Sequence, residues 1–393
     1  MERFWTSLCA AQADNARSSL TLGAGAEWGG TPGGGHSMFV RDCYKQLDCA
    51  VAASRFSLVR GTPGVGKSMF ALYHAWSSLQ RGGVDAIVYD YVVEATRKLR
   101  VIVERGVARD VEPGLLERLL EDATTLYIAD GTAPSRSTCR TLVVTSPKRE
   151  IWKDWGKELD VAEFILPPFD SSEIHLCREL CFPLLDDLGV SRSFDIWGGS
   201  ARLVLRQHVK TSTPAFLREL AASLTFDVLE STIHDLASAG SASAEMSQRV
   251  VHMVPDDDSL RSFHLRFASR RMSDIFYSLL QSAGEERIRR FMASSEASLS
   301  MGALRGQVFE RLALSILSRA GRASAIELSE IGRGTSSDEL LIDRDVLLFD
   351  HISFAVNKVR QCQRAGEVPP LCRPRAANFP TWDAASIDAM ADA

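Results

Sequence analysis

One segment constrains the fold of this chain more than any other, the run GTPGVGKS at positions 61–68. It matches the pattern G-x-x-x-x-G-K-[ST], in which a glycine-rich loop binds phosphate groups. An apolar strand candidate precedes it at 56–59, and a helix candidate with apolar residues at helical spacing follows at 69–79. Strand, loop and helix in this order distinguish a phosphate-binding loop from a chance cluster of glycines. We therefore predict that the chain binds a nucleoside triphosphate, ATP, together with Mg²⁺.

The residue types in this loop suit an anionic ligand. Glycines allow successive backbone N–H groups to point at one anion, in conformations that a side chain would forbid. The N-terminus of the following helix adds a partial positive charge, Lys67 is expected to reach the β- and γ-phosphates, and Ser68 is expected to hold Mg²⁺. The residues predicted to bind the nucleotide are Gly61, Thr62, Pro63, Gly64, Val65, Gly66, Lys67 and Ser68.

Short apolar strands alternate with helical stretches after the loop. Strand candidates lie at 86–89, 125–130, 141–146 and 162–166, and a helix is expected at 111–122. Continuous apolar strands separated by helices are typical of a parallel sheet that is covered on both faces. We therefore expect an α/β fold of the P-loop NTPase type (AAA+/STAND-like), followed by a mostly helical region and a partial α+β segment.

A strand-end aspartate follows the loop and suits the Mg²⁺ shell. Asp130 ends the strand candidate at 125–130, about sixty residues after Lys67, and four apolar or near-apolar residues precede it. A turn-capping aspartate is the plainer alternative. The next residue is Gly131 rather than the glutamate that polarises water in related ATPases. Hydrolysis is therefore expected to be slow, or to take its general base from elsewhere.

Two further segments resemble those that sense the γ-phosphate in AAA+ and STAND ATPases. Thr145 and Ser146 end another strand candidate, where a polar side chain contacts the γ-phosphate in those proteins. Arg202 ends the run GGSAR, which is similar to their G-G-x-x-R pattern. An arginine there would neutralise charge that develops in the transition state. Capping of a turn by Thr145 and a plain surface position for Arg202 are the alternatives.

Composition excludes some classes of protein and helps to divide the chain. The sequence is 45% hydrophobic and 24% charged, which is ordinary for a globular protein, and no run of about 18 apolar residues indicates a membrane span. The N-terminus lacks the profile of a signal peptide, and the net charge of -5 argues against a strongly basic nucleic-acid-binding surface. We expect a flexible leader at 1–37, an ATPase domain at 38–207, a helical lid or adaptor at 208–295 and a C-terminal segment at 296–393.

Several runs in this order resemble two related families. The runs are LVRGTPGVGKS, LYIADG, TLVVTSPKREIWKDW, AEFILPPFDSSEI and FDIWGGSARLVL, with the shorter pieces FVRDCY, VVHMVP, GALRGQVFE and RPRAANFPTWD. They are similar to the P-loop ATPase of the Crinkler effectors of oomycetes and fungi and of the retrotransposon hot spot proteins of trypanosomes. The resemblance covers about 39–390. It implies an effector or regulatory protein of the nucleus, in its own or a host cell, with a protein or chromatin/DNA partner; a cytoplasmic location is the alternative.

The same resemblance raises the question of a nuclease. In these families the ATPase is often followed by a domain of the restriction-endonuclease type, and the resemblance places Glu310 and Asp383 at two of its Mg²⁺-binding acids. Only ten residues follow Asp383, and they contain no lysine and no further strand to complete such a site. We therefore expect an incomplete nuclease-like segment and no DNA cleavage by this chain.

Two functions compete on these grounds. The first is a nucleotide-gated ATPase switch of the AAA+/STAND type. The second is a small-molecule kinase with a nucleoside-like acceptor, for which Asp90 and Glu94 are the candidate positioning acids. A nucleotide-binding protein with almost no turnover, indicated by Gly131, is a third possibility. The sensor-like segments and the long C-terminal extension favour the switch. A homo-oligomer is left open, because an arginine that acts in a neighbouring subunit cannot be recognised from the sequence.

Overall fold

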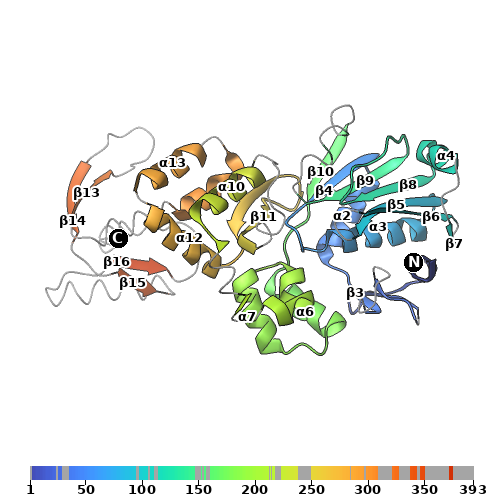
Figure 1. Cartoon of the computed structure of the whole chain (residues 1–393), viewed down its shortest axis with the longest axis horizontal. Coiled ribbons are helices and arrows are strands. Elements are labelled where there is room, and N and C mark those ends of the chain that lie inside the picture. Colours follow the sequence, from blue (N-terminus) through green and yellow to red (C-terminus); the bar gives the residue numbers. More distant parts are fainter. Residues whose placement is uncertain are drawn as a thin grey trace. The chain divides into compact units, whose positions relative to one another are not determined.

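The fold is described from a computed structural model of the chain (Figure 1). Contacts divide the chain into two units, Met1–Leu304 and Arg305–Ala393, and each is described by itself. The residues that the structure describes are 2–23, 25–28, 35–93, 97–104, 107–109, 114–146, 152, 155, 160–211, 213, 215–216, 223–237, 249–283, 285–295 and 298–308, with four short strands beyond them.

A seven-stranded, mostly parallel sheet forms the centre of the first unit, in the order β10-β4-β9-β8-β5-β6-β7. Five strands run parallel to one another: β4 (Phe56–Arg60), β5 (Ala86–Val93), β8 (Thr125–Asp130), β9 (Arg140–Thr145) and β10 (Val161–Ile165). Two antiparallel strands extend the edge beside β5: β6 (Arg97–Glu104) and β7 (Val107–Arg109). The predicted α/β organisation is confirmed, whereas the antiparallel edge was not predicted.

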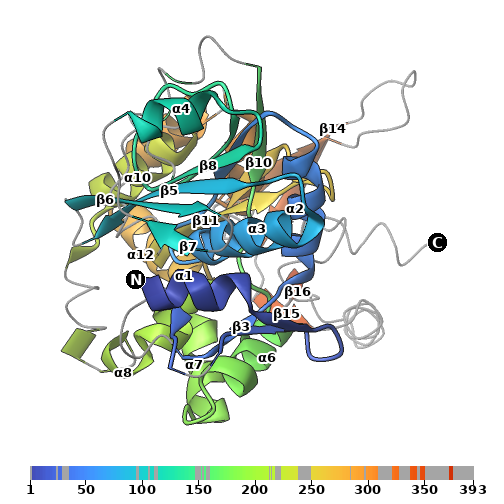
Figure 2. The same cartoon turned by 90° about the vertical axis from the view of Figure 1, so that its right-hand side faces the viewer.

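Helices cover both faces of this sheet. Successive side chains of a strand point to opposite faces, so neighbouring residues join different cores. Ile128 packs in a core with α2 (Asp42–Ala52) and α3 (Lys67–Arg81). Tyr127 packs on the other face with α4 (Leu115–Glu121). Figure 2 shows α4 on one side of the sheet and α2 and α3 on the other.

The N-terminal residues pack against this sheet, which corrects the expectation of a flexible leader at 1–37. Helix α1 (Glu2–Cys9) buries Trp5 and Leu8 in the core that contains α3, and the Trp5 ring lies 5.1 Å from the ring of Tyr89 in β5. Three short strands form an antiparallel sheet: β1 (Gln12–Asp14), β2 (Ser19–Thr21) and β3 (Ser37–Phe39). The many glycines and serines of this segment concealed an amphipathic helix in the sequence.

Mostly helical elements complete the first unit. They are α6 (Ser171–Cys181), α7 (Asp187–Trp197), the π-helical turn η3 (Arg202–Arg206), α8 (His208–Thr211), α10 (Phe226–Ala237), α12 (Arg270–Ala283), α13 (Glu285–Ser295) and η4 (Leu299–Met301). Phe276 lies in an aromatic cluster with Phe226 and Phe291 that joins α10, α12 and α13. The region expected to be helical also contains an antiparallel hairpin, β11 (Val251–Pro255) and β12 (Phe263–Phe267).

Four strands of the second unit are described. They form an antiparallel pair, β13 (Gly321–Ile326) with β14 (Ser337–Ile342), and a parallel pair, β15 (Val346–Phe349) with β16 (Leu371–Pro374). Glu310 and Asp383 lie outside the described residues, so the comparison with a nuclease stays a prediction. Across the described part of the chain, no helix has both the length and the apolar character needed to cross a membrane.

Candidate functional site

The glycine-rich loop lies where the sheet changes its winding direction. It connects the carboxyl end of β4 to the N-terminus of α3. Strand β4 lies between β9 and β10, while the strand that follows it in sequence, β5, lies on the far side of β8. Chains of an open α/β sheet diverge at such a point, and the crevice outside the strand ends is the usual position of a ligand.

Glycine is required at particular positions in this loop. Gly64 and Gly66 have φ angles of 88° and 96°, which side-chain-bearing residues rarely adopt. A Cβ atom on Gly66 would also lie 2.3 Å from the Tyr44 hydroxyl oxygen. A Cβ atom on Gly61 would lie 2.7 Å from the carbonyl oxygen of Leu166. Backbone conformation and close packing therefore explain the glycines that the sequence motif requires.

Lys67 directs its ammonium group into the loop. Its Nζ donates hydrogen bonds to the carbonyl oxygens of Gly61, at 2.7 Å, and of Thr62, at 2.9 Å. The side chain is buried, and burial lowers the pKa of Lys67 to about 7, helped by the positive charge of Arg202 and opposed by Asp130. The ammonium thus lies beside loop carbonyls and within electrostatic reach of two other predicted site residues.

Asp130 and Ser68 come together beside Lys67. Burial raises the pKa of Asp130, while hydrogen bonds from Ser68 and Tyr89 and the charges of Lys67 and Arg202 act in the opposite direction. The Tyr89 hydroxyl donates to Asp130 Oδ2 at 3.0 Å. Ser68 is exposed, and Asp130 is partly exposed. A hydroxyl and a carboxylate are oxygen ligands of the kind that Mg²⁺ prefers, so these residues fit that ion.

Arg202 reaches the loop from a distant part of the chain. Its backbone N–H donates to the carbonyl oxygen of Gly64 at 3.2 Å, and its exposed side chain begins η3. The preceding glycines allow this approach. A Cβ atom on Gly198 would lie 1.9 Å from the carbonyl oxygen of Ala268, and one on Gly199 would lie 2.2 Å from that of Phe169. The GGSAR segment therefore packs too closely for side chains at its glycines.

Thr145 is less clearly part of this cluster. It ends β9, one position beyond Val144, which pairs with Asp130. Its side chain is buried, and its hydroxyl donates to the carbonyl oxygen of Ser146 at 2.9 Å. Among the contacts described, none joins Thr145 to Lys67 or Arg202. The turn-capping alternative accounts for the hydroxyl as it is placed here.

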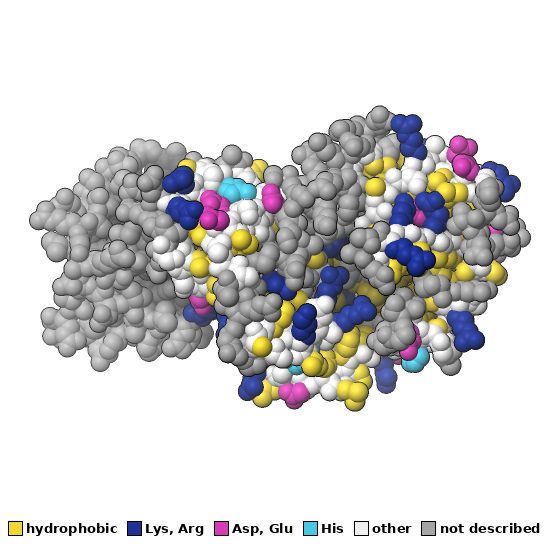
Figure 3. Space-filling model, viewed as in Figure 1, with side chains coloured by type: hydrophobic (Ala, Val, Ile, Leu, Met, Phe, Trp, Pro, Cys, Tyr) yellow, Lys and Arg dark blue, Asp and Glu magenta, His cyan; other side chains and the backbone are white. Residues whose placement is uncertain are grey.

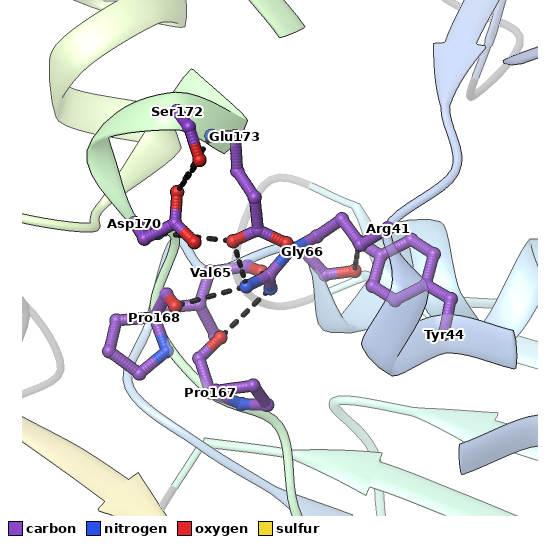
Figure 4. A network of polar contacts seen from close by, with 9 residues as sticks. All are labelled: Arg41, Tyr44, Val65, Gly66, Pro167, Pro168, Asp170, Ser172 and Glu173. Carbon is purple, nitrogen blue, oxygen red and sulfur yellow. Dashed lines mark hydrogen bonds and ion pairs between the residues drawn. The ribbon is translucent and has the colours of Figure 1, made fainter. Parts of the chain in front are cut away.

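Arg41, which sequence reasoning did not assign to the site, lies directly behind the loop (Figure 4). Its side chain is 1% exposed and donates to both carboxylate oxygens of Glu173, at 2.9 and 2.7 Å. It also donates to the carbonyl oxygens of Pro167, Pro168 and Val65, at 2.8, 3.0 and 3.4 Å. The available signal was an arginine inside the apolar run FVR before the first helix.

Thr62 is held from the hairpin. Its hydroxyl oxygen accepts a hydrogen bond from the backbone N–H of Met253 in β11 at 2.9 Å, in a buried position. Because the two residues are distant in sequence, nothing in the local pattern indicated this contact. The hairpin is therefore in direct contact with the loop.

Asp90, proposed for a kinase acceptor, has its carboxylate fully engaged. The residue is 0% exposed and forms a double contact with Arg100, including Nη2 to Oδ2 at 2.6 Å. Lys98 Nζ lies 2.9 Å from Oδ2, and the Tyr127 hydroxyl donates to the same oxygen at 2.8 Å. These bonds lower the pKa of Asp90 despite its burial. Glu94, the other candidate, lies outside the described residues.

Comparisons with known proteins give a weak but extended similarity. The chain is 22% identical over 278 residues to Crinkler effector protein 16 of Phytophthora infestans, which covers 69% of this chain and 43% of that protein. It is 22% identical over 276 residues to Crinkler effector protein 15 of the same organism, covering 69% and 44%. The matched region spans less than half the length of these relatives. No protein-family model matches the chain. The similarity supports a Crinkler-like relationship, and the resemblance to retrotransposon hot spot proteins stays a prediction.

Proposed function

We propose that this chain is a nucleotide-gated switch that binds ATP and Mg²⁺ at the glycine-rich loop. The observation that carries the proposal is the convergence of Lys67, Ser68, Asp130 and Arg202 on one loop at the switch point of the sheet. These residues come from three separate parts of the sequence. Their types supply an ammonium, a hydroxyl, a carboxylate and a guanidinium, which together suit a triphosphate and its metal ion.

Each residue has a defined task in this proposal. Lys67 exchanges its two carbonyl partners for phosphate oxygens, which stabilise the charged ammonium better than neutral carbonyls. Ser68 and Asp130 hold the metal ion, which neutralises phosphate charge when it is bound. Arg202 faces the same region from η3 and responds to the terminal phosphate. The hairpin that holds Thr62 and the segment that carries Arg202 both contact the loop. A conformational change of the loop would therefore affect both of them.

Slow turnover is part of the proposal. Efficient hydrolysis needs a general base within hydrogen-bond reach of the attacking water. Asp130 is the one carboxylate that acts on the pKa of Lys67 among the described residues, and it already accepts from Ser68 and Tyr89. Gly131 follows it and offers no side chain. These observations favour a protein whose state depends on the bound nucleotide over a fast ATPase.

The kinase alternative receives no support from Asp90. A residue that positions an acceptor needs a free oxygen facing the ligand, and those of Asp90 are occupied by Arg100, Lys98 and Tyr127. Its ion pairs join β5 and β6 instead. The role of Asp90 that best fits these contacts is structural.

Location and partners are proposed from the Crinkler-like similarity alone. We place the protein in the nucleus of its own or a host cell, with a protein or chromatin/DNA partner and the option of self-association. On the face in Figure 3, Lys and Arg side chains occur at several separate places, among apolar and acidic ones. A partner recognised through one continuous basic surface receives no support from that face.

The test is to measure MgATP binding and phosphate release by the purified chain, with and without DNA. Lys67→Ala should weaken binding by at least tenfold, because it removes the only ammonium of the loop. Lys45→Ala is the matched control, since Lys45 is a surface residue paired with Asp42. Equal binding by Lys67→Ala and the unaltered chain would sink the assignment. Phosphate transfer to a nucleoside without net hydrolysis would instead support the kinase.

A further inference from the structure

Two peptide groups of the glycine-rich loop are held from behind by residues that precede α2 or lie in its first turn. Arg41, the residue before α2, donates from Nη1 to the carbonyl oxygen of Val65 at 3.4 Å. Tyr44 in α2 donates from its hydroxyl to the carbonyl oxygen of Gly66 at 2.9 Å. Figure 4 shows Arg41 and Tyr44 beside Val65 and Gly66.

These contacts help to fix where the opposite edges of the peptide groups point. In a planar trans peptide the C=O and N–H bonds point in opposite directions. When the Val65 carbonyl is directed at Arg41, the N–H of Gly66 faces away from it. The Gly66 carbonyl oxygen accepts both from the Tyr44 hydroxyl and, at 2.9 Å, from the N–H of Phe70 in the first turn of α3, so the N–H of Lys67 likewise faces away. Successive N–H groups that point to one side form a concave site for an anion.

We propose that Arg41 and Tyr44 are positioning residues for phosphate binding, which act by fixing the N–H groups of Gly66 and Lys67 toward the anion. The proposal rests on the proposed function and names two residues that shape the loop backbone for phosphate binding. Neither side chain needs to touch the ligand. Both act through the loop backbone.

Arginine is the residue type that this position requires. Its guanidinium has five N–H donors, and five hydrogen bonds leave Arg41: two to Glu173 and one each to Pro167, Pro168 and Val65. A lysine has three donors on one atom and cannot make this set. The ring of Phe169 lies 4.0 Å from the guanidinium carbon and covers one face. The charge is therefore buried with all its donors used.

Glu173 fixes Arg41 in turn. Its Oε2 accepts a hydrogen bond from the N–H of Asp170 at 3.1 Å, while Asp170 Oδ1 accepts from the N–H of Glu173 at 2.8 Å. This reciprocal pair forms a capping box at the start of α6. Arg41 is thus tied to a helix terminus on one side and to the loop on the other. Tyr44 is equally fixed, because its ring is buried against Phe70 at 5.7 Å.

Tyr44→Phe is the sharpest test, because it removes one hydroxyl and leaves the ring in the core. Tyr73→Phe is the matched control, because it makes the same change in an adjoining ring whose centre lies 6.1 Å from that of Tyr44. Affinities would be measured for MgATP, MgGTP and inorganic tripolyphosphate, with thermal unfolding to verify the fold. Tyr44→Phe should weaken all three by a similar factor of about five to ten, as expected for one hydrogen bond. Tyr73→Phe should leave all three unchanged.

The outcomes separate this inference from the proposed function. If the unaltered chain binds none of the three ligands, the proposed function fails, and this inference with it. If it binds them and Tyr44→Phe binds them equally well, the positioning role alone is wrong. A loss confined to one nucleotide, with tripolyphosphate unaffected, would mean a contact with the base and would also overturn it. Arg41→Lys gives a second reading, with an expected loss of about tenfold for all three ligands, because it cannot reproduce the fork of donors.

Discussion

The surroundings of Lys67 disfavour its charged form. Its ammonium is buried against two carbonyl oxygens, with the guanidinium of Arg202 near enough to disfavour the charged form. The nearby carboxylate of Asp130 only partly offsets these effects, and the pKa of Lys67 falls to about 7. In the unfolded chain the same group has a pKa near 10.5. The protonation state of Lys67 therefore contributes to stability in a pH-dependent way.

The sign of that contribution can be measured. Between pH 7 and 10.5 the unfolded chain binds more protons at Lys67 than the folded chain, so the free energy of unfolding rises with pH. From pH 7 to 9, the unaltered chain should gain on the order of 2 kcal/mol relative to Lys67→Met. Urea unfolding of both proteins at the two pH values measures the gain. If the difference in unfolding free energy between the two proteins stayed constant with pH, that result would contradict the lowered pKa of Lys67. Lys45→Met provides the control.

The sequence indicates the residues of the proposed site through local patterns, but it does not indicate the residues that support them. Lys67, Ser68 and Asp130 follow patterns that depend on local spacing, and Arg202 follows a short glycine motif. Arg41 could not be assigned in this way, because its partner Glu173 lies 132 residues later. The hydroxyl of Thr145 was expected to face the phosphate, yet the oxygen it contacts belongs to the adjacent residue. Side-chain direction at a strand end is decided by such local bonds.

The hairpin of β11 and β12 is a small element with a direct hold on the loop. Met253 donates its backbone N–H to the Thr62 hydroxyl oxygen in a buried position. Next to it, the N–H of Ile165 at the end of β10 donates to the carbonyl oxygen of Leu260 at 2.7 Å. The hairpin therefore bonds both to the loop that follows β4 and to the neighbouring strand. Short strands of this kind have weak sequence signals, which is why a helical region was expected instead.

Replacing Thr62 tests the strength of this attachment. Thr62→Val keeps the shape of the side chain but leaves the Met253 N–H without its acceptor in a buried position. The free energy of unfolding should fall by about 1–3 kcal/mol, as measured by urea unfolding. Thr62→Ser keeps the hydroxyl oxygen, so its free energy of unfolding should fall by less. If the valine variant proved as stable as the unaltered chain, the bond would contribute nothing to the fold.

For the molecule as a whole, the parallel part of the sheet was predictable and its edge was not. The inner strands are continuous apolar runs because they are buried on both faces, as in Ile128 and Tyr127. Strand β6 instead begins with charged residues, RKLRVIVE, and lies toward the exposed edge, so its sequence does not stand out. The N-terminal helix was missed for a related reason, since its few apolar residues are surrounded by polar ones.

The extent of the first unit leads to a prediction about fragments. All residues assigned to the site, and all their described contacts, lie within 1–304. A fragment of residues 1–304 should therefore fold and bind MgATP within about twofold of the full chain. A fragment of residues 1–207 lacks the hairpin and should bind at least tenfold more weakly or fail to fold. Titration with MgATP and circular dichroism melts of both fragments measure this. Full binding by the shorter fragment would instead support the domain boundary predicted at 207.

The contact between Thr62 and Met253 also limits how early during synthesis the loop can reach its final structure. The two residues are separated by 191 positions, and their bond forms only after the later one has left the ribosome. At ordinary rates of about 5–20 residues per second, the growing chain carries its loop without that bond for about 10–40 s. During that interval the nascent protein contains the whole loop, but the loop lacks its hydrogen bond to the hairpin. If the proposed function is correct, newly made chains should bind MgATP with full affinity only when the hairpin has been made, well after the motif itself.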